Sequence, residues 1–282
     1  MNPPKHSDPA GAAELSDRDF RRLSALVYER SGIQLTPQKQ TLVRNRLSRR
    51  IRARGLRSFE EYLDLLLGAD RQEEEFDRML ESICTHVTEF FREPAHFDYL
   101  ARIFAPRRKS TGRLRILSAG CSSGEEPYSI AICLNEALGP DSPVKIQVEA
   151  VDLSASILNI AQAGIYHAER VRKMPRQVLH RYFLKGGDRF PGQVRVTPEI
   201  RRCVQFRRMN LIRPERFDAP FDAIFCRNVI IYFDRQTQLD CFRWFHESLA
   251  PGGVLFLGHS ESLIGADHDF EYVQPTVYMR KG

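Results

Sequence analysis

The chain has 282 residues, of which 42% are hydrophobic and 28% charged, a balance typical of a globular protein large enough for two cores. No apolar run approaches the roughly 20 residues that a membrane helix needs, and the first residues lack the apolar core of a signal peptide. Six cysteines are scattered without a C-x-x-C pair, so neither a metal site nor a disulfide framework is expected. These features predict a cytoplasmic protein, and the net charge of +6 favours an acidic partner.

The N-terminal third of the chain has a helical pattern. Residues 1–15 are rich in Pro, Gly, Ala and polar groups, which predicts a disordered tail. From Ser16 to about Ser82 apolar residues recur three and four positions apart, Ser16 is placed to cap the first of four helices, and glycines follow the first three. A small all-helical domain is predicted over residues 16–90, followed by a linker helix within residues 91–112.

The second predicted helix, at about residues 36–54, carries a run of like charge. No acidic residue occurs between Thr41 and Ser58, and the arginines here are Arg44, Arg46, Arg49, Arg50, Arg52, Arg54 and Arg57. This could be a solvated face, but solvated faces usually mix both signs. The pattern therefore favours a binding surface for an acidic partner. Nucleic acid is the usual first candidate, although few aromatic residues interleave to stack on single strands.

The stretch from Arg113 to Ile132 reads as a strand, a glycine loop and a helix. Its Gly120-x-Ser122-x-Gly124 spacing departs from the dinucleotide pattern G-x-G-x-x-G, and no P-loop lysine follows. Glu125 and Glu126 place negative charge where a phosphate would be disfavoured. The loop suits a cofactor with a cationic amino-acid end, such as S-adenosylmethionine, unless it is a turn that binds nothing.

An acidic residue ends the next predicted strand, residues 144–151. Asp152 is placed to accept hydrogen bonds from ribose hydroxyls, as acids at this position of doubly wound sheets do. The alternative is that Asp152 caps the following helix, residues 154–163. Its pairing with the glycine loop favours the ribose interpretation.

The remainder of the chain alternates strands and helices. Residues 164–204 are less regular and predict an inserted subdomain, in which residues 194–196 and 203–206 form a hairpin that either recognises a partner or is a decoration. Beyond it lie the expected strands 204–208, 221–226, 254–257 and 277–280 and the helix 236–249. Such alternation from residue 113 onward predicts a mostly parallel sheet with a hairpin-like end.

Four separated motifs together resemble one known family. They are Thr-His-Val-Thr-Glu-Phe-Phe-Arg-Glu at 85–93, Ser-Ser-Gly-Glu-Glu-Pro-Tyr-Ser-Ile-Ala at 122–131, Phe-Asp-Ala-Ile-Phe-Cys-Arg-Asn-Val-Ile-Ile-Tyr-Phe-Asp at 221–234 and Gly-His-Ser-Glu at 258–261. In this order they resemble the CheR family of chemotaxis receptor methyltransferases. The resemblance implies an α/β fold: a doubly wound, mostly parallel Rossmann-like methyltransferase sheet over 113–282, with the N-terminal all-helical domain and a small β-subdomain inserted at about 168–206.

The activity that the resemblance implies is methyl transfer from S-adenosylmethionine to glutamate side chains of chemoreceptors, forming methyl esters that adjust receptor signalling and leaving S-adenosylhomocysteine. The implied partner is the acidic helical region of the receptor, docked on Arg46, Arg50 and Arg54, with a receptor tail peptide as a possible ligand of the β-subdomain. The protein would then be recruited to receptor clusters at the inner face of the membrane, without inserting into it and without binding nucleic acid.

The resemblance also implies the site residues. Cofactor contacts carry over to His86, Thr88, Arg92, Glu125, Glu126, Asp152, Asn210, Leu211, Arg227 and Asn228, with Glu126 favoured over Glu125. Arg92 and Tyr232 match residues that face the methyl group and the substrate carboxylate. His86 departs from the family, much of which has a small polar residue there.

Two other functions are weighed against this one. A methyltransferase acting on nucleic acid would use the arginines for phosphates, but Cys226-Arg227-Asn228-Val229 stands where base-amine methylation uses Asn-Pro-Pro-Tyr or Asp-Pro-Pro-Tyr, and no Pro-Cys nucleophile occurs. An adaptor that senses the cofactor without catalysis is the alternative from another class.

Overall fold

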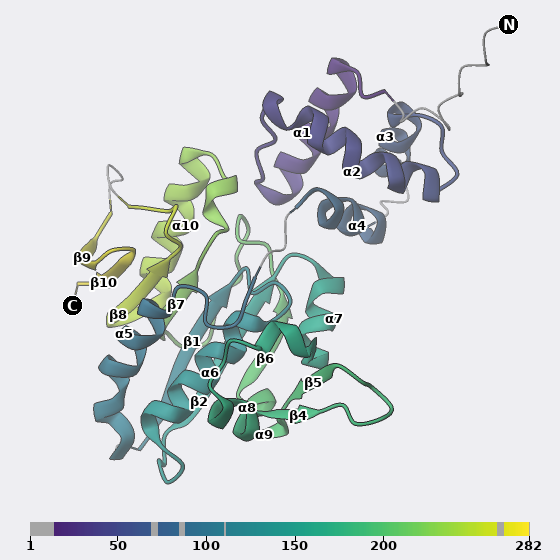
Figure 1. The fold of residues 1–282 in the computed structure, drawn as a ribbon. Coiled ribbons are helices and arrows are strands. Elements are labelled where there is room, and N and C mark those ends of the chain that lie inside the picture. Colours follow the sequence, from purple (N-terminus) through teal and green to yellow (C-terminus); the bar gives the residue numbers. More distant parts are fainter. Residues whose placement is uncertain (1–13, 69–72, 85–87, 110, 264–267, 282) are drawn as a thin grey trace, which may run out of the picture. The chain divides into compact units, whose positions relative to one another are not determined.

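The computed structural model describes residues 14–68, 73–84, 88–109, 111–263 and 268–281, and the chain divides into two compact units, Met1–Thr85 and His86–Gly282 (Figure 1). This division falls five residues before the domain boundary that the sequence predicts. Residues 1–13 of the predicted tail lie outside the described residues, whereas Leu15 is buried and its carbonyl accepts a hydrogen bond from Gln40. No helix in the described ranges combines the length and apolarity needed to cross a bilayer.

The first unit consists of short helices whose ends are set by local sequence. Ser16 caps the first of them by accepting a hydrogen bond from the backbone of Asp19, and Gly32 ends it in the left-handed conformation, as the sequence predicts. The helices are α1 (Asp17–Ser31), a 3-10 turn (Pro37–Lys39), α2 (Gln40–Ala53), α3 (Phe59–Leu67) and α4 (Glu73–Ile83). Their apolar faces meet around Leu23, Leu47 and Tyr62, which are fully buried.

The arginine-rich helix α2 has an acidic partner within its own unit. Glu75 of α4 is 3% exposed and accepts two hydrogen bonds from Arg50, at 2.7 and 2.6 Å. Arg54 lies 3.5 Å from the same carboxylate, and the Tyr62 hydroxyl donates to it at 2.8 Å. Arg46 instead donates to the backbone carbonyl of Ile83. Part of the charge that looks unrelieved in the sequence is therefore neutralised by an acid 25 residues from Arg50.

A seven-stranded sheet forms the centre of the second unit, with strand order β6-β2-β1-β7-β8-β10-β9. The strands are β1 (Arg113–Ala119), β2 (Lys145–Asp152), β6 (Val204–Arg208), β7 (Phe221–Cys226), β8 (Leu249–Leu257), β9 (Phe270–Gln274) and β10 (Val277–Arg280). The first five run parallel, while β10 is antiparallel to both β8 and β9. The mostly parallel sheet with a hairpin at one end is thereby confirmed.

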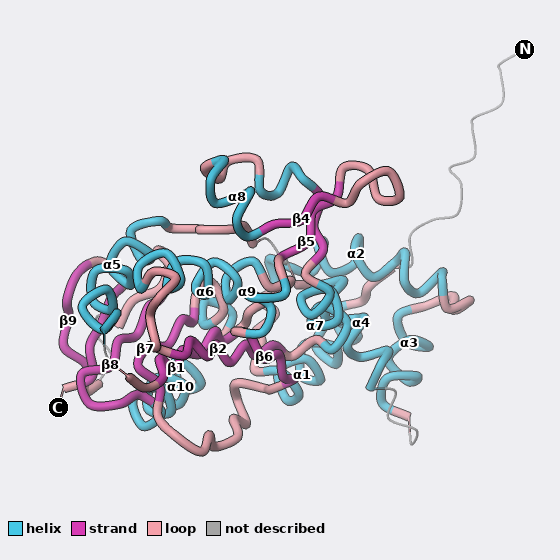
Figure 2. The backbone as a smooth tube through the Cα atoms, turned by 90° about the horizontal axis from the view of Figure 1, so that it is seen from below, coloured by secondary structure: helices cyan, strands magenta, loops and turns pink. Residues whose placement is uncertain are grey.

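Helices cover both faces of this sheet, with α5 and α6 on one side and α10 on the other (Figure 2). Their bounds are α5 (Pro94–Phe104), a 3-10 turn (Ala105–Lys109), α6 (Glu125–Leu138), α7 (Ala155–Ala163) and α10 (Arg235–Ser248). The core is a continuous apolar cluster in which Phe225 stacks on Phe256 with ring centroids 4.2 Å apart. Burial of this apolar cluster stabilises the sheet and thereby holds the ends of its strands in position.

The inserted subdomain has a different pairing from the predicted one. Its sheet has the order β3-β5-β4, with β3 (Ile165–His167), β4 (Phe183–Lys185) and β5 (Gln193–Val196) all antiparallel, accompanied by η3 (Ala168–Val171), α8 (Arg176–Tyr182) and α9 (Pro198–Arg202). The hairpin predicted between residues 194–196 and 203–206 is wrong. The short helix α9 separates the two segments, and Val204–Arg208 pairs with β2 in the large sheet.

Candidate functional site

Three loops meet at one edge of the large sheet because β2, β1 and β7 are parallel neighbours. They are the glycine loop 120–124 after β1, the turn after Asp152, and the segment 227–229 after β7. In open α/β sheets ligands bind at this edge, where the carboxyl ends of the strands lie. All three loops belong to the second unit.

The glycine loop is packed tightly against its two neighbours. The amides of Gly120 and Cys121 both donate to the carbonyl of Val151, at 2.8 and 3.0 Å. Gly120 has φ +79°, and a Cβ atom there would lie 2.3 Å from Cγ2 of Val229. Only glycine allows the loop after β1 to approach the loop after β7 this closely.

Asp152 is tied to the glycine loop by its side chain. One carboxylate oxygen accepts from the amide of Ser122 at 2.9 Å, and the other accepts from the amide of Ser154 at 3.0 Å. The residue that caps α7 is Ser154, whose hydroxyl accepts from the amide of Ile157. The alternative role of Asp152 as the helix cap is therefore wrong, and a contact to ribose remains a prediction.

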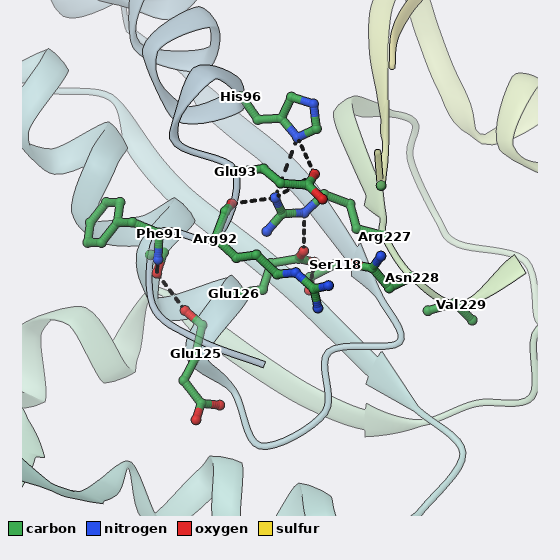
Figure 3. A network of polar contacts seen from close by, with 12 residues as sticks. Phe91, Arg92, Glu93, His96, Ser118, Glu125, Glu126, Arg227, Asn228 and Val229 are labelled. Atoms are coloured by element: carbon green, nitrogen blue, oxygen red, sulfur yellow. Dashed lines mark hydrogen bonds and ion pairs between the residues drawn. The ribbon is translucent and has the colours of Figure 1, made fainter. Parts of the chain in front are cut away.

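Glu126 and Arg227 form a buried ion pair beneath the loops (Figure 3). Nε of Arg227 lies 2.6 Å from Oε2 of Glu126, and the two side chains are 2% and 10% exposed. The second carboxylate oxygen accepts a hydrogen bond from the hydroxyl of Ser118, in β1, at 2.7 Å. Both charges are therefore paired in the protein interior, where water screens their attraction only weakly.

The same guanidinium holds the segment that precedes α5. Arg227 donates from Nη1 to the carbonyl of Arg92 at 2.5 Å, and that nitrogen lies 3.4 Å from both Oε2 of Glu93 and Nδ1 of His96. Phe91 and Glu93 both have positive φ, 53° and 58°, so this turn needs such external support. The sequence indicated no role for Glu93, which follows Phe90-Phe91-Arg92 directly, or for His96, four residues after Arg92.

His96 is buried and uncharged at neutral pH. Burial, and next the positive charge of Arg227, lower its pKa to about 4. Its Nε2 lies 2.8 Å from the hydroxyl of Thr276. Glu93, His96 and His259 bring three potential metal ligands within 4.8 Å of one another, but the guanidinium of Arg227 already supplies a positive charge there.

Glu261 shapes the loop that carries Asn228. Its carboxylate accepts hydrogen bonds from four backbone amides, at 2.8, 2.9, 3.4 and 2.7 Å; the donors are Asn228, Val229, Ile231 and Gly258. These contacts hold Asn228 at φ +60°. Burial raises the pKa of Glu261, while the four amides oppose that shift. The Gly-His-Ser-Glu motif contained this residue, but the motif alone indicated no role for it.

Glu125 has a different environment from Glu126. It is 0% exposed, accepts from the hydroxyl of Ser123 at 2.6 Å and pairs with Arg170 at 2.9 Å. Figure 3 shows its side chain directed away from Arg227. Burial raises the pKa of Glu125, and Arg170 opposes that rise. Of the two loop glutamates, Glu126 is the one that lies with Arg227.

Two buried polar atoms lack an internal partner at this edge. Within the described residues, Oγ of Ser122 and Oδ1 of Asn228 are buried and make no hydrogen bond. Buried polar groups are normally satisfied, so an orphan pair in adjacent loops indicates a ligand that supplies donors. Together with the carboxylates of Glu126 and Asp152, these atoms fit a ligand that carries both a positive charge and hydroxyl groups.

The other predicted site residues have varied surroundings. The carbonyl of Thr88 accepts from Arg170, the side-chain oxygen of Asn210 accepts from the amide of Ile212, and Leu211 is buried after β6. Tyr232 is half-buried at the end of a 3-10 turn, Ile230–Tyr232. The predicted contact of His86 lies outside the described residues. Arg46, Arg50 and Arg54 belong to the first unit.

Known proteins match both units. The model of the CheR methyltransferase SAM-binding domain matches residues 86–279, and that of the CheR methyltransferase all-alpha domain matches residues 18–84. The chain is 43% identical over 265 residues to a chemotaxis protein methyltransferase of Salmonella typhimurium, covering 94% of this chain and 90% of that protein. It is 42% identical over 262 residues to chemotaxis protein methyltransferase 2 of Pseudomonas aeruginosa, covering 92% of each.

Proposed function

The chain belongs to the CheR family of S-adenosylmethionine-dependent chemotaxis methyltransferases, and on that premise we propose that its acceptor is a glutamate side chain of a chemoreceptor. The product would be a glutamate methyl ester that adjusts receptor signalling during sensory adaptation. The observation that supports this proposal is that Glu126, Arg227 and Asn228 lie together at the sheet edge and that Arg227 also bonds to the backbone of Arg92 (Figure 3).

The residues at this edge fit S-adenosylmethionine. When bound, this cofactor supplies an electrophilic methyl group on a sulfonium. In this proposal Asp152 accepts from the ribose hydroxyls, and the oxygens of Ser122 and Asn228 that make no internal hydrogen bond accept from the cofactor's remaining donors. Glu126 supplies negative charge for the ammonium, and its pairing with Arg227 keeps the carboxylate in one orientation.

The acceptor needs no general base. A glutamate side chain has a reference pKa of about 4.3 and is already ionised at neutral pH. The protein must instead align the carboxylate oxygen and remove water from it. An arginine about 4 Å away attracts a carboxylate by roughly 4 kcal/mol at an effective dielectric constant of 20, so Arg92 can position it. If Arg92 bound the acceptor carboxylate more tightly, it would stabilise the ground state and slow methyl transfer. We assign Tyr232 the role of orienting the same carboxylate through its hydroxyl.

The arginine-rich helix α2 is proposed as the surface that docks on the acidic helical region of the receptor. Arg46, Arg50 and Arg54 make contacts within the first unit, and the loss of Arg50 would leave the charge of Glu75 less well compensated. Arg49 and Arg52 are exposed and are not among the arginines that contact Glu75, so they give a cleaner test. Docking there would recruit the protein to receptor clusters at the inner membrane face.

The double variant Arg49→Ala/Arg52→Ala should raise the apparent KM for receptor and leave the affinity for S-adenosylhomocysteine unchanged. The double variant Arg18→Ala/Arg21→Ala removes the same charge from the exposed face of α1 and should change neither quantity. Because exposed charges act through a screened field, the difference should shrink as salt is added. Equal effects of the two double variants on KM would exclude α2 as the docking surface.

The inserted sheet is proposed as a second receptor contact, for a tail peptide. Its strand β4 pairs with β5 on one side and is an outer strand, and its Leu184 is 52% exposed. An extended peptide can add to such an edge through backbone hydrogen bonds. Titration of the protein with the C-terminal peptide of its receptor should show saturable binding that Leu184→Asp abolishes.

One labelling experiment separates the three functions considered. The protein is incubated with S-adenosylmethionine carrying a labelled methyl group and with receptor-bearing membranes. Label in receptor protein that alkali releases as methanol is expected, because an ester is base-labile and a methylamine is not. Label in nucleic acid would indicate a nucleic-acid methyltransferase. Cofactor binding with no label transferred would indicate an adaptor.

A further inference from the structure

The β-subdomain holds helix α6 at two separate places. Near the N-terminal end, the hydroxyl of Tyr166 donates to the carbonyl of Ser123 at 2.7 Å, and Arg170 pairs with Glu125 at 2.9 Å. Toward the C-terminal end, the hydroxyl of Tyr182 and NH1 of Arg181 both reach Oε1 of Glu136, at 2.5 and 3.0 Å. We call these the loop clamp (Tyr166 and Arg170) and the distal clamp (Tyr182 and Arg181).

The loop clamp contacts the part of the glycine loop that contains a non-glycine residue with positive φ. Ser122 has φ 49°, which is unfavourable for a residue with a side chain, and Gly124 has φ 95°, which glycine adopts readily. A Cβ atom on Gly124 would lie 3.0 Å from the hydroxyl oxygen of Tyr166 and 2.9 Å from Cβ of Ala161. The loop therefore rests directly on the insert. A serine in this conformation, as Ser122 is, persists only when its surroundings fix it.

Arg170 joins three parts of the second unit. Its NH1 donates to Oε1 of Glu125 and, at 2.8 Å, to the carbonyl of Thr88, which follows the boundary of the unit. Phe90 in the same segment packs edge-on against the rings of Tyr166 and Phe183, with centroids 4.9 and 5.4 Å away. Without Arg170, the fully buried Glu125 would lose the cation that balances it.

We propose that Tyr166 and Arg170 are positioning residues for the cofactor site: through them the β-subdomain holds the glycine loop in the shape that binds the cofactor, and so sets cofactor affinity. This proposal rests on the cofactor site proposed above. The distal clamp has the same residue types and holds the same helix, but it lies away from the loop. It provides a matched control for effects on stability alone.

The test compares Tyr166→Phe and Arg170→Ala with Tyr182→Phe and Arg181→Ala. The dissociation constant of S-adenosylhomocysteine is measured by titration calorimetry, and Tm is measured on the same samples. Loss of one buried hydrogen bond that shapes the loop should weaken binding about three- to tenfold. Tyr182→Phe should lower Tm about as much as Tyr166→Phe, because each removes one hydrogen bond of a buried tyrosine, whereas Arg181→Ala acts on an exposed pair and should lower Tm less than Arg170→Ala. Both distal variants should leave the dissociation constant within about twofold of wild type. Arg170→Lys, which keeps the charge, should recover part of the affinity.

A kinetic split separates positioning from a general loss of folded protein. Loop-clamp variants should raise KM for S-adenosylmethionine and keep kcat at saturating cofactor, whereas partial unfolding lowers apparent kcat and leaves KM unchanged. Equal dissociation constants for Tyr166→Phe and Tyr182→Phe would overturn the proposal. Glu126→Gln serves as the reference. If neither Glu126→Gln nor the loop-clamp variants change the affinity for S-adenosylhomocysteine, the proposed cofactor site is wrong. If Glu126→Gln weakens binding and the loop-clamp variants do not, only the proposed role of the loop clamp is wrong.

Discussion

The guanidinium of Arg227 and the carboxylate of Glu126 lie 2.6 Å apart in the interior, although 101 residues separate them in the chain. The pair joins the end of β7 to the first turn of α6. Removing one partner leaves the other charge buried without compensation, which typically costs about 3–5 kcal/mol. We therefore expect loss of this ion pair to lower the free energy of unfolding and to weaken cofactor binding.

Glu126→Gln should lower the free energy of unfolding by about 3 kcal/mol in urea titrations and weaken the binding of S-adenosylhomocysteine. The control Glu136→Gln changes a pair whose side chains are 45% and 48% exposed and should cost less than about 1 kcal/mol. The double variant Glu126→Gln/Arg227→Gln should be less destabilised than the sum of the single variants. Simple additivity would mean that the two charges do not depend on each other.

Gly120→Ala should disrupt the packing between the loops after β1 and β7. The new Cβ would lie 2.3 Å from Val229 at a residue with φ +79°, so strain and overpacking act together and we expect a loss of about 3 kcal/mol. Gly252→Ala, with φ +73° and nothing within 4 Å, should lose only about 1 kcal/mol. Urea titration of both variants measures the difference, and similar losses would show that the loops can separate at little cost.

His96 should make stability fall on acidification. Its pKa is about 4 in the folded protein and about 6.5 when unfolded, so the unfolded chain binds the proton first. The stabilisation is complete above pH 6.5 and is lost as the pH falls toward 4, by up to about 3 kcal/mol. His96→Gln should remove this part of the pH dependence, and His180→Gln, at an exposed position of α8, should not. Urea titrations at intervals between pH 7 and 4 provide the comparison.

Glu261→Gln should weaken cofactor binding through the Asn228 loop. A glutamine has one acceptor oxygen in place of two, so it cannot satisfy all four amides that Glu261 now accepts from. We expect about a tenfold weaker affinity for S-adenosylhomocysteine by calorimetry. Glu271→Gln, at an exposed position of β9, is the control. Unchanged affinity in Glu261→Gln would show that the loop keeps its shape without these bonds.

Arg92 and Tyr232 should act on the receptor reaction. Arg92→Ala should lower kcat/KM for receptor by about a hundredfold, because misplacement of the carboxylate by a single ångström has effects of that size. Tyr232→Phe removes only a hydroxyl and should cost about tenfold. Initial rates of ester formation at saturating cofactor measure both. Wild-type rates in Arg92→Ala would exclude it from contact with the acceptor.

Local sequence determined most of the secondary structure. Ser16 and Gly32 set the ends of α1, and the turn between β1 and α6 follows from its glycines, because capping and positive φ depend on residues close in the chain. The alternation of strands and helices gave the parallel sheet, and parallel strands necessarily bring their carboxyl ends to one edge. The glycine loop that precedes Glu126, and the strand that ends at Asp152, could be placed at that edge from the sequence.

Tertiary structure decided which residues at the edge act together. Glu75 beside Arg50, Glu261 beneath Asn228 and Arg170 against Glu125 are pairs formed by folding between segments remote in sequence. A pattern of residue types carries no record of such partners, because burial and distance depend on how the whole core packs. For the same reason the sequence predicted a hairpin of residues 194–196 and 203–206, whereas the folded chain places β5 in the small sheet and residues 204–208 in the large one.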